Sequence, residues 1–570
     1  MEDKTINSQL QQKQKMLNAA INLHQNGKLD EAENIYISLL SASPNDSNIL
    51  HLLGLITHQK GDLKKAIGLI EKAIKLDPKS PLYRSNFGKI LNQAGYYQIA
   101  EENLRIAIKQ NPNLIEAYNS LGIALTNLKK YDEAKNVLLQ LVEKAPNDIY
   151  GLNNLGNIYY AQKDFENAEK SYNKALALAP KNAVTLNNVA KIFEEKSQFD
   201  KAAHFYKLAS ESAPQSPIIY NNLCNTLTNL HDVKPAIEYA TKAISLAPNY
   251  AEAHWNKALA LLLSQDYING WQEFEWRIQN TTYEAISPDD QKNKKWNGES
   301  LANKKLLILD EQGHGDTIQF SRYIPYIKKE GGEIIFHVKK ALIPLLKSIG
   351  NIDSFIEWTD NTVDSNLFDY YIPLLSLPYL FKTDISSIPN KTPYLSVVNS
   401  NKFQELITPS KINIGIVWAG NTDQKNDKNR SIPLELFSSL FELDNKELQF
   451  YSLQKGPPEK ELIDFKHNDS IVDLSNYIDN YEDTAHAILK LDLVVSVCTS
   501  VAHLSSALDK ATWVLLCHNS DWRWHLNGSD SPWYPSAKLF RQKSLGNWGS
   551  VIEELKTEIY NFAEEKLTCT

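Results

Sequence analysis

The sequence predicts an all-α helical-repeat solenoid followed by an α/β region made of two Rossmann-like lobes. Three observations support this: prolines recur at a fixed period in the first half, the period fails in a polar segment near residue 280, and short apolar runs then alternate with helix-like segments. The predicted boundaries are a tail at 1–12, a repeat array at 13–284, a linker at 285–300, a first lobe at 301–405, a second lobe at 406–560 and a tail at 561–570.

The period of the first half is 34 residues. Alanine lies twelve residues before each proline, and a small residue lies twenty-four before most of them. A proline ends the second helix of a pair, while small side chains let two antiparallel helices approach closely. The proline column is Pro44, Pro78, Pro112, Pro146, Pro180, Pro214 and Pro248; the small-residue column is Gly54, Gly88, Gly122, Gly156, Ala190 and Cys224.

These columns resemble the signature of tetratricopeptide (TPR) repeats and predict seven helix pairs. An eighth, degenerate unit covers residues 251–280, with Gly270 in the alanine column, and is expected to cap the array. Such arrays curve and present a concave groove to partners.

Asparagine recurs two residues before the small-residue column. Its amides could hold an extended acceptor chain in the groove, as in the asparagine ladder of TPR-bearing O-GlcNAc transferases, which this series resembles; equally, they could serve local hydrogen bonding within the array. The series is Asn86, Asn154, Asn188, Asn222 and Asn256.

After residue 300, apolar runs predict parallel strands, with helices between them. The predicted strands are 304–310, 333–338, 368–374, 412–420, 448–454, 492–498 and 512–517; the predicted helices include 341–349, 434–441, 481–491 and 500–508. Ligands of such sheets bind at the carboxyl ends of the strands, so the segments that follow the strands are the candidate site.

The first candidate follows the first strand. Gly313 and Gly315 permit a tight turn close to a ligand, and Asp316 opens a helix. Asp316 suits two compatible roles, the helix N-cap and a general base that takes a proton from a hydroxyl.

The second candidate is the loop after residue 420. Asn421, Lys425, Lys428 and Arg430 put positive charge where a diphosphate leaving group needs it. An ordinary solvated loop is the alternative.

The third candidate is the turn Cys498, Thr499 and Ser500, followed by His503 on a helix. Hydroxyls and free N–H groups at a helix start form an anion site. His503 fits a functional role and a packing role about equally.

Residues 309–329 resemble the opening motif of the ADP-heptose:lipopolysaccharide heptosyltransferases, and more closely that of their TPR-fused relatives. The segments 418–437, 452–457 and 521–542 are similar to hallmarks of the same relatives. This resemblance implies a metal-independent glycosyltransferase domain of the GT-B type, with Asp316 as catalytic base.

The resemblance also assigns the donor site. It implies a donor-phosphate loop with Lys428 and Arg430 and a donor-binding turn around Thr499, and it adds Gln454 to the site. Cys498 departs from the family, where an aspartate is common. The aromatic residues Trp522, Trp524, Trp533 and Tyr534 are expected mainly to anchor their loop to the core.

Composition excludes several classes. The formal net charge is −8 and no dense Lys/Arg block occurs, which argues against nucleic acid as a partner. The four cysteines form no CxxC pair, which argues against a zinc site and fits a reducing compartment. No apolar run has the length of a membrane span. We expect a cytoplasmic protein without a cofactor or metal.

The main hypothesis is therefore a hexosyl- or heptosyl-type transferase. It would move a sugar from a nucleotide-diphosphate donor to an acceptor hydroxyl, with the TPR groove recruiting a protein or glycan acceptor. The alternative is a TPR scaffold with a degenerate, non-catalytic transferase-like domain, as Cys498 suggests.

Overall fold

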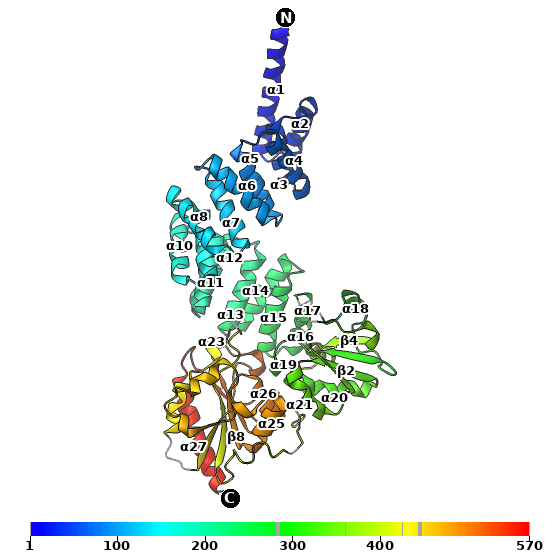
Figure 1. Cartoon of the computed structure of the whole chain (residues 1–570), viewed down its shortest axis with the longest axis vertical. Helices are drawn as coiled ribbons and strands as arrows, with labels where there is room; N and C mark the ends of the chain where they lie inside the picture. The colour runs from blue at the N-terminus through cyan, green and yellow to red at the C-terminus, as the bar shows by residue number, and fades with distance from the viewer. Residues whose placement is uncertain are drawn as a thin grey trace. The chain divides into compact units, whose positions relative to one another are not determined.

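The computed structural model describes residues 2–280, 285–359, 361–398, 400–424, 426–442 and 447–568; residues 2–10 and 280 are described by their backbone alone. The chain divides into two compact units, residues 1–214 and 215–570. Figure 1 follows the chain by colour from the N-terminal helices to the C-terminal helix.

The first unit consists of antiparallel helix pairs, and the predicted helical repeats are confirmed. Helix α1 begins at Glu2, inside the segment expected to be a tail. The helices are α1 (Glu2–Gln25), α2 (Leu29–Ala42), α3 (Ser47–Gln59), α4 (Leu63–Leu76), α5 (Pro81–Gln93), α6 (Tyr97–Gln110), α7 (Ile115–Asn127), α8 (Tyr131–Lys144), α9 (Ile149–Ala161), α10 (Phe165–Leu178), α11 (Ala183–Glu195) and α12 (Phe199–Ser212).

The small-residue column lies where the two helices of a pair cross. A Cβ at Gly88 of α5 would lie 2.4 Å from Cγ of Leu104 in α6, and one at Gly122 of α7 would lie 2.7 Å from Cδ2 of Leu138 in α8. The alanine column is fully buried, as at Ala66 and Ala100. A side chain at Gly88 or Gly122 would therefore force the facing leucine or its helix to shift.

The second unit begins with the last helix pairs, α13 (Pro217–Asn229), α14 (Val233–Leu246), α15 (Ala251–Leu263) and α16 (Tyr267–Phe274), followed by the short helices α17 (Arg277–Asn280) and α18 (Pro288–Asn293). The eighth repeat does not end the array with a solvent-facing cap. Its apolar side chains belong to one hydrophobic core with both sheets of the α/β region.

The contacts of two side chains show how this repeat is joined to the α/β region. Trp271 is buried, packs edge-on against Trp522 at 5.2 Å between ring centroids, and donates from Nε1 to the Thr383 carbonyl at 3.1 Å. Arg277 donates to both carboxylate oxygens of the buried Glu311, at 3.0 and 2.7 Å. The described part of the expected linker is likewise packed, since Trp296 is 1% exposed.

The first sheet has four parallel strands in the order β3-β2-β1-β4. Its strands are β1 (Lys305–Leu309), β2 (Glu333–Val338), β3 (Ser354–Glu357) and β4 (Tyr370–Pro373). Its short helices are α19 (His314–Phe320), α20 (Ile324–Ile327), α21 (Ile343–Leu346) and α22 (Leu377–Leu380).

The second sheet has six parallel strands in the order β10-β9-β8-β5-β6-β7. The strands are β5 (Ile412–Val417), β6 (Leu448–Ser452), β7 (Ile471–Asp473), β8 (Leu493–Val497), β9 (Thr512–Leu516) and β10 (Ala537–Arg541), and the helices are α23 (Asp427–Arg430), α24 (Ser438–Phe441), α25 (Tyr481–Lys490), α26 (Ser500–Ala507) and α27 (Gly549–Thr568). Helix α27 continues past the boundary expected at residue 560.

Both sheets have the strand order of the Rossmann arrangement, the first in shortened form. In the second sheet the order reverses between β5 and β8, and in the first between β1 and β4. Such reversal points open a crevice at the carboxyl ends of the strands, so the loops after β1, β5 and β8 are placed to bind a ligand.

Candidate active site

A cavity of about 800 Å³ lies between the two sheets. Its wall comes from the segments that follow β1, β5, β6, β8 and β9, together with Ala341 after β2 and residues 478–484 before and within α25. The site residues predicted from four separate segments of the sequence thus line one cavity. They are Gly313, Gly315, Asp316, Asn421, Arg430, Gln454, Cys498, Thr499, Ser500 and His503.

One predicted cation of the described residues is not among those that line the cavity. Lys428 is exposed and does not line the cavity. Helix α23 turns Asp427 and Arg430 inward, three residues apart on one face, and Lys428 lies on a different face. Lys425 lies outside the described residues.

Asp316 is not the N-cap of α19 that the sequence suggested: Gly313 is the N-cap, and Asp316 lies three residues further on and bonds back to it. Its Oδ2 accepts from the Gly313 N–H at 2.9 Å, which fixes the start of α19. Its Oδ1 accepts from Nη2 of Arg523 in a close ion pair. The carboxylate is therefore held in one orientation at the cavity wall.

The surroundings of Asp316 act on the pKa of its carboxyl in two opposite directions. Burial raises the pKa of the carboxyl above its ordinary value, and the nearby carboxylates Asp521 and Glu311 act in the same direction. The Arg523 guanidinium and the Gly313 N–H lower the pKa and limit the rise. A raised pKa suits a proton acceptor that works near neutral pH.

Arg523 is the main residue that sequence reasoning missed. It donates through Nε to Gln319 Oε1 at 2.7 Å and through Nη1 to Asp521 Oδ1 at 2.9 Å, and it lies over the Trp522 ring at 4.5 Å. The available signal was an arginine inside an aromatic-rich loop, a residue type that stacks on rings and binds carboxylates in a fork.

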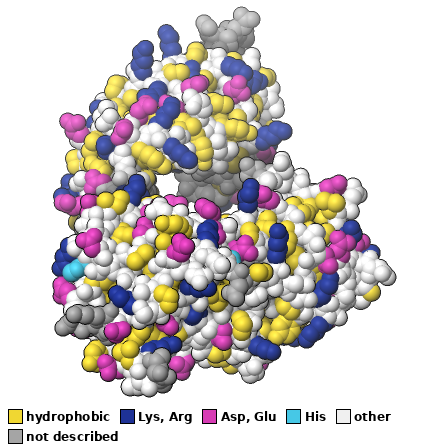
Figure 2. All heavy atoms as spheres, turned by 60° about the horizontal axis from the view of Figure 1, so that its bottom comes forward, with side chains coloured by type: hydrophobic (Ala, Val, Ile, Leu, Met, Phe, Trp, Pro, Cys, Tyr) yellow, Lys and Arg dark blue, Asp and Glu magenta, His cyan; other side chains and the backbone are white. Residues whose placement is uncertain are grey.

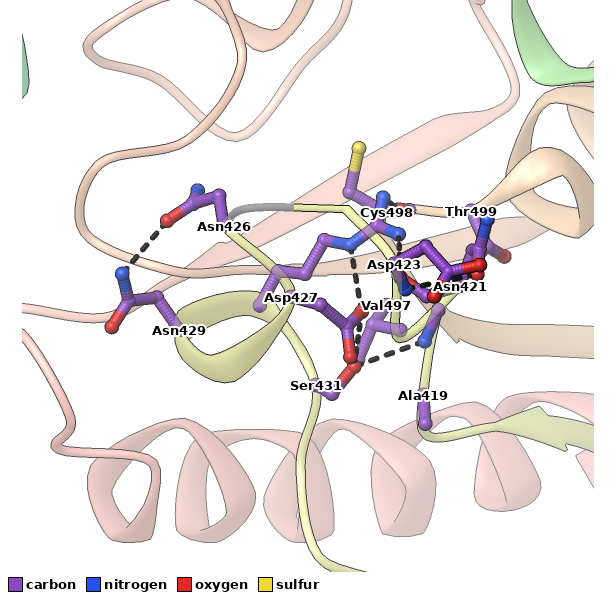
Figure 3. Close-up of polar contacts among 12 residues, drawn as sticks. Ala419, Asn421, Asp423, Asn426, Asp427, Asn429, Ser431, Val497, Cys498 and Thr499 are labelled. Atoms are coloured by element: carbon purple, nitrogen blue, oxygen red, sulfur yellow. Dashed lines mark hydrogen bonds and ion pairs between the residues drawn. The ribbon is translucent and has the colours of Figure 1, made fainter. Parts of the chain in front are cut away.

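Arg430 also lines the cavity and is held by a small network of hydrogen bonds, part of which is drawn around Asp427 and Ser431 in Figure 3. It donates from Nε to Asp427 Oδ1 at 3.1 Å and from Nη1 to the Cys498 carbonyl at 3.0 Å. Asp427 also accepts from the Ser431 hydroxyl at 2.8 Å, and that hydroxyl accepts from the Gly420 N–H at 3.0 Å. The loop after β5 and the turn after β8 are thereby tied together at the reversal point.

The start of α26 faces the same cavity. Thr499 is its N-cap and makes no side-chain capping bond. Its hydroxyl instead pairs with Ser496 Oγ at 3.0 Å, and Ser500 accepts from the Tyr481 hydroxyl at 2.8 Å. The first N–H groups of a helix have no intrahelical acceptor, so this turn offers donors to an anion in the cavity.

The Cys498 side chain is a neutral thiol. Its Sγ accepts from Trp524 Nε1 at 3.0 Å, and burial raises its pKa to about 11. The thiol therefore supplies no negative charge where a carboxylate is common in the resembled family.

His503 makes packing contacts as well as lining the cavity. Its Nδ1 pairs with the Tyr534 hydroxyl at 3.0 Å, and its ring stacks on Trp524 at 5.3 Å. Burial lowers its pKa far below the ordinary value. Gly315 allows the approach, because a Cβ there would lie 2.9 Å from Cδ2 of His503.

Gln454 lines the cavity, but its side-chain amide is bonded to the backbone just after β5. Its Oε1 accepts from the Trp418 and Ala419 N–H groups at 3.1 and 2.9 Å, and its Nε2 donates to the Ala419 carbonyl at 3.1 Å. These bonds set the course of the chain just after β5.

The asparagine series of the array is half-buried and bonds between repeats. Asn86 pairs with His51 Nε2 at 2.9 Å, Asn154 donates to Asn119, Asn188 donates to Asn157 at 3.2 Å, and Asn256 donates to Asn221 at 2.9 Å. These bonds join each amide to the preceding repeat, which favours the local role; recognition of an acceptor stays a prediction for Asn222 and the others.

The charge pattern of the surface, the grouping of potential metal ligands and the apolarity of the helices bear on nucleic-acid binding, metal binding and membrane insertion. On the face drawn in Figure 2, Lys and Arg side chains are interspersed with Asp and Glu instead of forming a basic stripe. Among the described residues, no cluster of His, Cys, Asp and Glu has the arrangement of a metal site. In the same part of the chain, no helix combines the length and apolarity that a membrane crossing requires.

Comparisons with known proteins identify the repeats. Tetratricopeptide-repeat family models match residues 115–148 and 149–215, and the model described as anaphase-promoting complex, cyclosome, subunit 3 matches residues 25–107. The chain thus carries TPR repeats in its N-terminal part.

One curated relative is Protein FlbA of Caulobacter vibrioides, 21% identical over 406 residues. The match covers 59% of this chain and 66% of the relative, so the chain spans just under two thirds of that protein's length.

Solved structures with some likeness include that of Pseudomonas aeruginosa pilF (21% identity, TM-score 0.33, 37% of this chain and 96% of that one). Another is a TPR protein from Parabacteroides merdae (15%, TM-score 0.39, 44% and 99%), and a third is yeast Tom70 (22%, TM-score 0.35, 43% and 54%).

Proposed function

We propose that the chain is a metal-independent glycosyltransferase of the GT-B type, which transfers a sugar from a nucleotide-diphosphate donor to an acceptor hydroxyl. The observation that carries the proposal is that one cavity is lined by Asp316 from the first lobe and by Arg430 and the start of α26 from the second. A transferase needs a proton acceptor and a site for a departing diphosphate within one enclosed space.

The second lobe would hold the donor. Arg430 and the N–H groups at Thr499 and Ser500 would neutralise charge on the diphosphate as the bond from its oxygen to the sugar breaks. Support comes from their position at the strand-order reversal, the usual ligand position of Rossmann-like sheets. The sugar and the nucleotide base stay open, because a donor pocket changes easily within one fold.

The first lobe would supply the base. Asp316 would take the proton of the acceptor hydroxyl as its oxygen bonds to the sugar, and the proton would remain on the carboxyl until product release. The raised pKa and fixed orientation of this carboxyl support the assignment. The TPR repeats would recruit a protein or glycan acceptor.

The test is Asp316→Asn in the full chain. Because the amide cannot accept the proton, we expect turnover to fall by a factor on the order of 10²–10⁴. Donor binding, measured by calorimetry with a donor found in a nucleotide-sugar thermal-shift panel and identified by mass spectrometry, should stay within about threefold. Asp384→Asn, at an Asp of the same lobe that does not line the cavity, is the matched control. Wild-type turnover in Asp316→Asn would refute the assignment.

The second candidate is a TPR scaffold with a non-catalytic transferase-like domain. It is favoured by the internal pairing of both charged groups, Asp316 with Arg523 and Arg430 with Asp427, and by the neutral thiol at Cys498. If no nucleotide or nucleotide sugar raises the melting temperature, this candidate replaces the first.

A further inference from the structure

The segment from Cys517 to His525 carries several residues of the cavity wall. It follows β9 and contributes Cys517, Asn519, Ser520, Asp521 and Arg523. Arg523 reaches across to the first lobe, where it binds Asp316 and Gln319. The placement of this segment therefore helps to orient the Asp316 carboxylate, whose other oxygen is held by the Gly313 N–H.

The last repeats contact both ends of this segment. At its start, Asn519 Nδ2 donates to Oδ1 of Asn229, at the end of α13, with 3.0 Å between the atoms, and the rings of His518 and His231 lie 4.7 Å apart. No described repeat residue lines the cavity itself. The repeats thus act on the cavity through this segment.

At the other end of the segment, the α15–α16 turn binds the His525 ring through both nitrogens. Gln265 Nε2 lies 3.3 Å from Nδ1, and the Tyr267 hydroxyl lies 2.6 Å from Nε2. Tyr267 also accepts from Trp533 Nε1 at 3.3 Å. All three contacts are buried or half-buried, so water competes poorly for them.

His525 has a backbone conformation that a side chain disfavours. Its φ of 59° and ψ of −179° lie in a region occupied almost only by glycine. A non-glycine residue stays there only when its surroundings hold it. The contacts of Gln265 and Tyr267 with the His525 ring contribute to that restraint two residues away from Arg523, together with Arg541 Nη1, which donates to the His525 carbonyl at 3.1 Å.

We propose that residues 215–280, the last repeats of the array, are a working part of the catalytic unit, because they hold the 517–525 segment so that Arg523 orients Asp316. Arg523 is the positioning residue, and Tyr267 and Gln265 are the contacts through which the repeats act. The inference rests on the proposed function for its catalytic meaning, while the mechanical link stands on the contacts alone.

The experiment is amide hydrogen exchange by mass spectrometry on full-length Tyr267→Phe and Gln265→Asn. Asparagine tolerates the left-handed backbone at this position (φ 70°) but has one methylene less reach. We expect peptides covering 517–525 and 311–317 to exchange at least threefold faster, while 412–417 in β5 is unchanged. Tyr239→Phe on α14, at a hydroxyl that has no hydrogen bond to any described residue, is the matched control.

Kinetics give the second readout. With the donor used for Asp316→Asn, both variants should lose at least fivefold in kcat with donor KM within twofold, because the base is misplaced while the diphosphate site is intact. A donor KM that rises with kcat unchanged contradicts the proposal.

The exchange measurement separates this proposal from the proposed function. Unchanged exchange at 517–525 in both variants overturns the link, as does a uniform rise that includes 412–417 or an equal rise in Tyr239→Phe. If the wild type turns over no nucleotide sugar, the proposed function fails while the exchange result still decides whether the repeats hold the segment.

Discussion

Gly420 lies where the Arg430 guanidinium meets the chain. A Cβ there would lie 2.3 Å from Nη2 and 2.6 Å from Cζ of Arg430. Only glycine lets the guanidinium lie flat against this turn, so the residue controls the position of the cation without carrying charge itself.

We therefore expect Gly420→Ala to displace Arg430 and to weaken binding of a nucleoside diphosphate about tenfold, close to the effect of Arg430→Ala, since a misplaced cation loses its charge-assisted bonds. Calorimetric titration measures this. The control is Gly549→Ala at the start of α27, where an added Cβ would lie 3.8 Å from its nearest neighbour, Oδ1 of Asn547. Equal affinity in Gly420→Ala and wild type would show that Arg430 does not contact the diphosphate.

The pair Asp316 and Arg523 predicts a pH effect. The guanidinium lowers the carboxyl pKa, so its removal in Arg523→Gln should raise that pKa further. A base works only when deprotonated, so the acid limb of the kcat profile should move to higher pH. Arg523→Lys keeps a positive charge and should move the limb less. A shift to lower pH in Arg523→Gln would contradict the pairing.

For individual residues, sequence reasoning identified those cavity-lining residues that lie in short motifs after strands. Asp316, Arg430 and Thr499 each follow a strand end, and parallel strands bring such ends to one edge. Arg523 could not be found this way, because its partner Asp316 is 207 residues away and depends on how the two lobes pack. Lys428 was misplaced because periodicity does not reveal the orientation of a one-turn helix.

Individual helix pairs allow a paired test of the small-residue column. Gly88 of α5 packs against Leu104, whereas a methyl group added at Gly68 of α4 would meet no described atom within 4 Å beyond the adjacent residues and the nearby backbone of its own helix. Gly88→Ala should destabilise the chain by about 1–3 kcal/mol through overpacking. Gly68→Ala should stabilise it by about 0.5–1 kcal/mol, because alanine has the higher helix propensity.

Urea unfolding followed by circular dichroism measures both changes. The two substitutions add the same methyl group to helices of the same unit, so only the space around it differs. A similar effect of both would show that the small-residue column is not set by helix approach.

The repeat helices were predictable because their punctuation is periodic, but the α/β elements were less so. Pro325 and Pro344 each lie in the first turn of a new four-residue helix, so the helix expected to open at Asp316 and the one expected at 341–349 are both divided into short pieces. The strands β3, β7 and β10 were missed. β3 is partly exposed at the sheet edge, and β7 has three residues, so neither produces a long apolar run.

For the whole chain, the sequence placed the main boundary where the 34-residue period fails, but the compact units divide at residue 214. Periodicity records how each repeat packs on the next and contains no information on what else its outer face contacts. Trp271 and Arg277 look like ordinary repeat residues, yet they are buried against the α/β region.

Truncation distinguishes these two boundaries. We expect residues 215–570 to fold alone and to bind a nucleoside diphosphate as the full chain does, because their core is continuous.

The shorter fragment, cut at residue 284, lacks Arg277. Its buried Glu311 carboxylate therefore has no bidentate partner, at a cost of about 3–5 kcal/mol. The cut also uncovers the Trp522 face that Trp271 covers. Since domains are stable by only about 5–15 kcal/mol, the shorter fragment should melt far lower or fail to fold, as thermal circular dichroism would show. Equal melting of both fragments would mean that the last repeats contribute nothing to the α/β region, and that its boundary lies where the period ends.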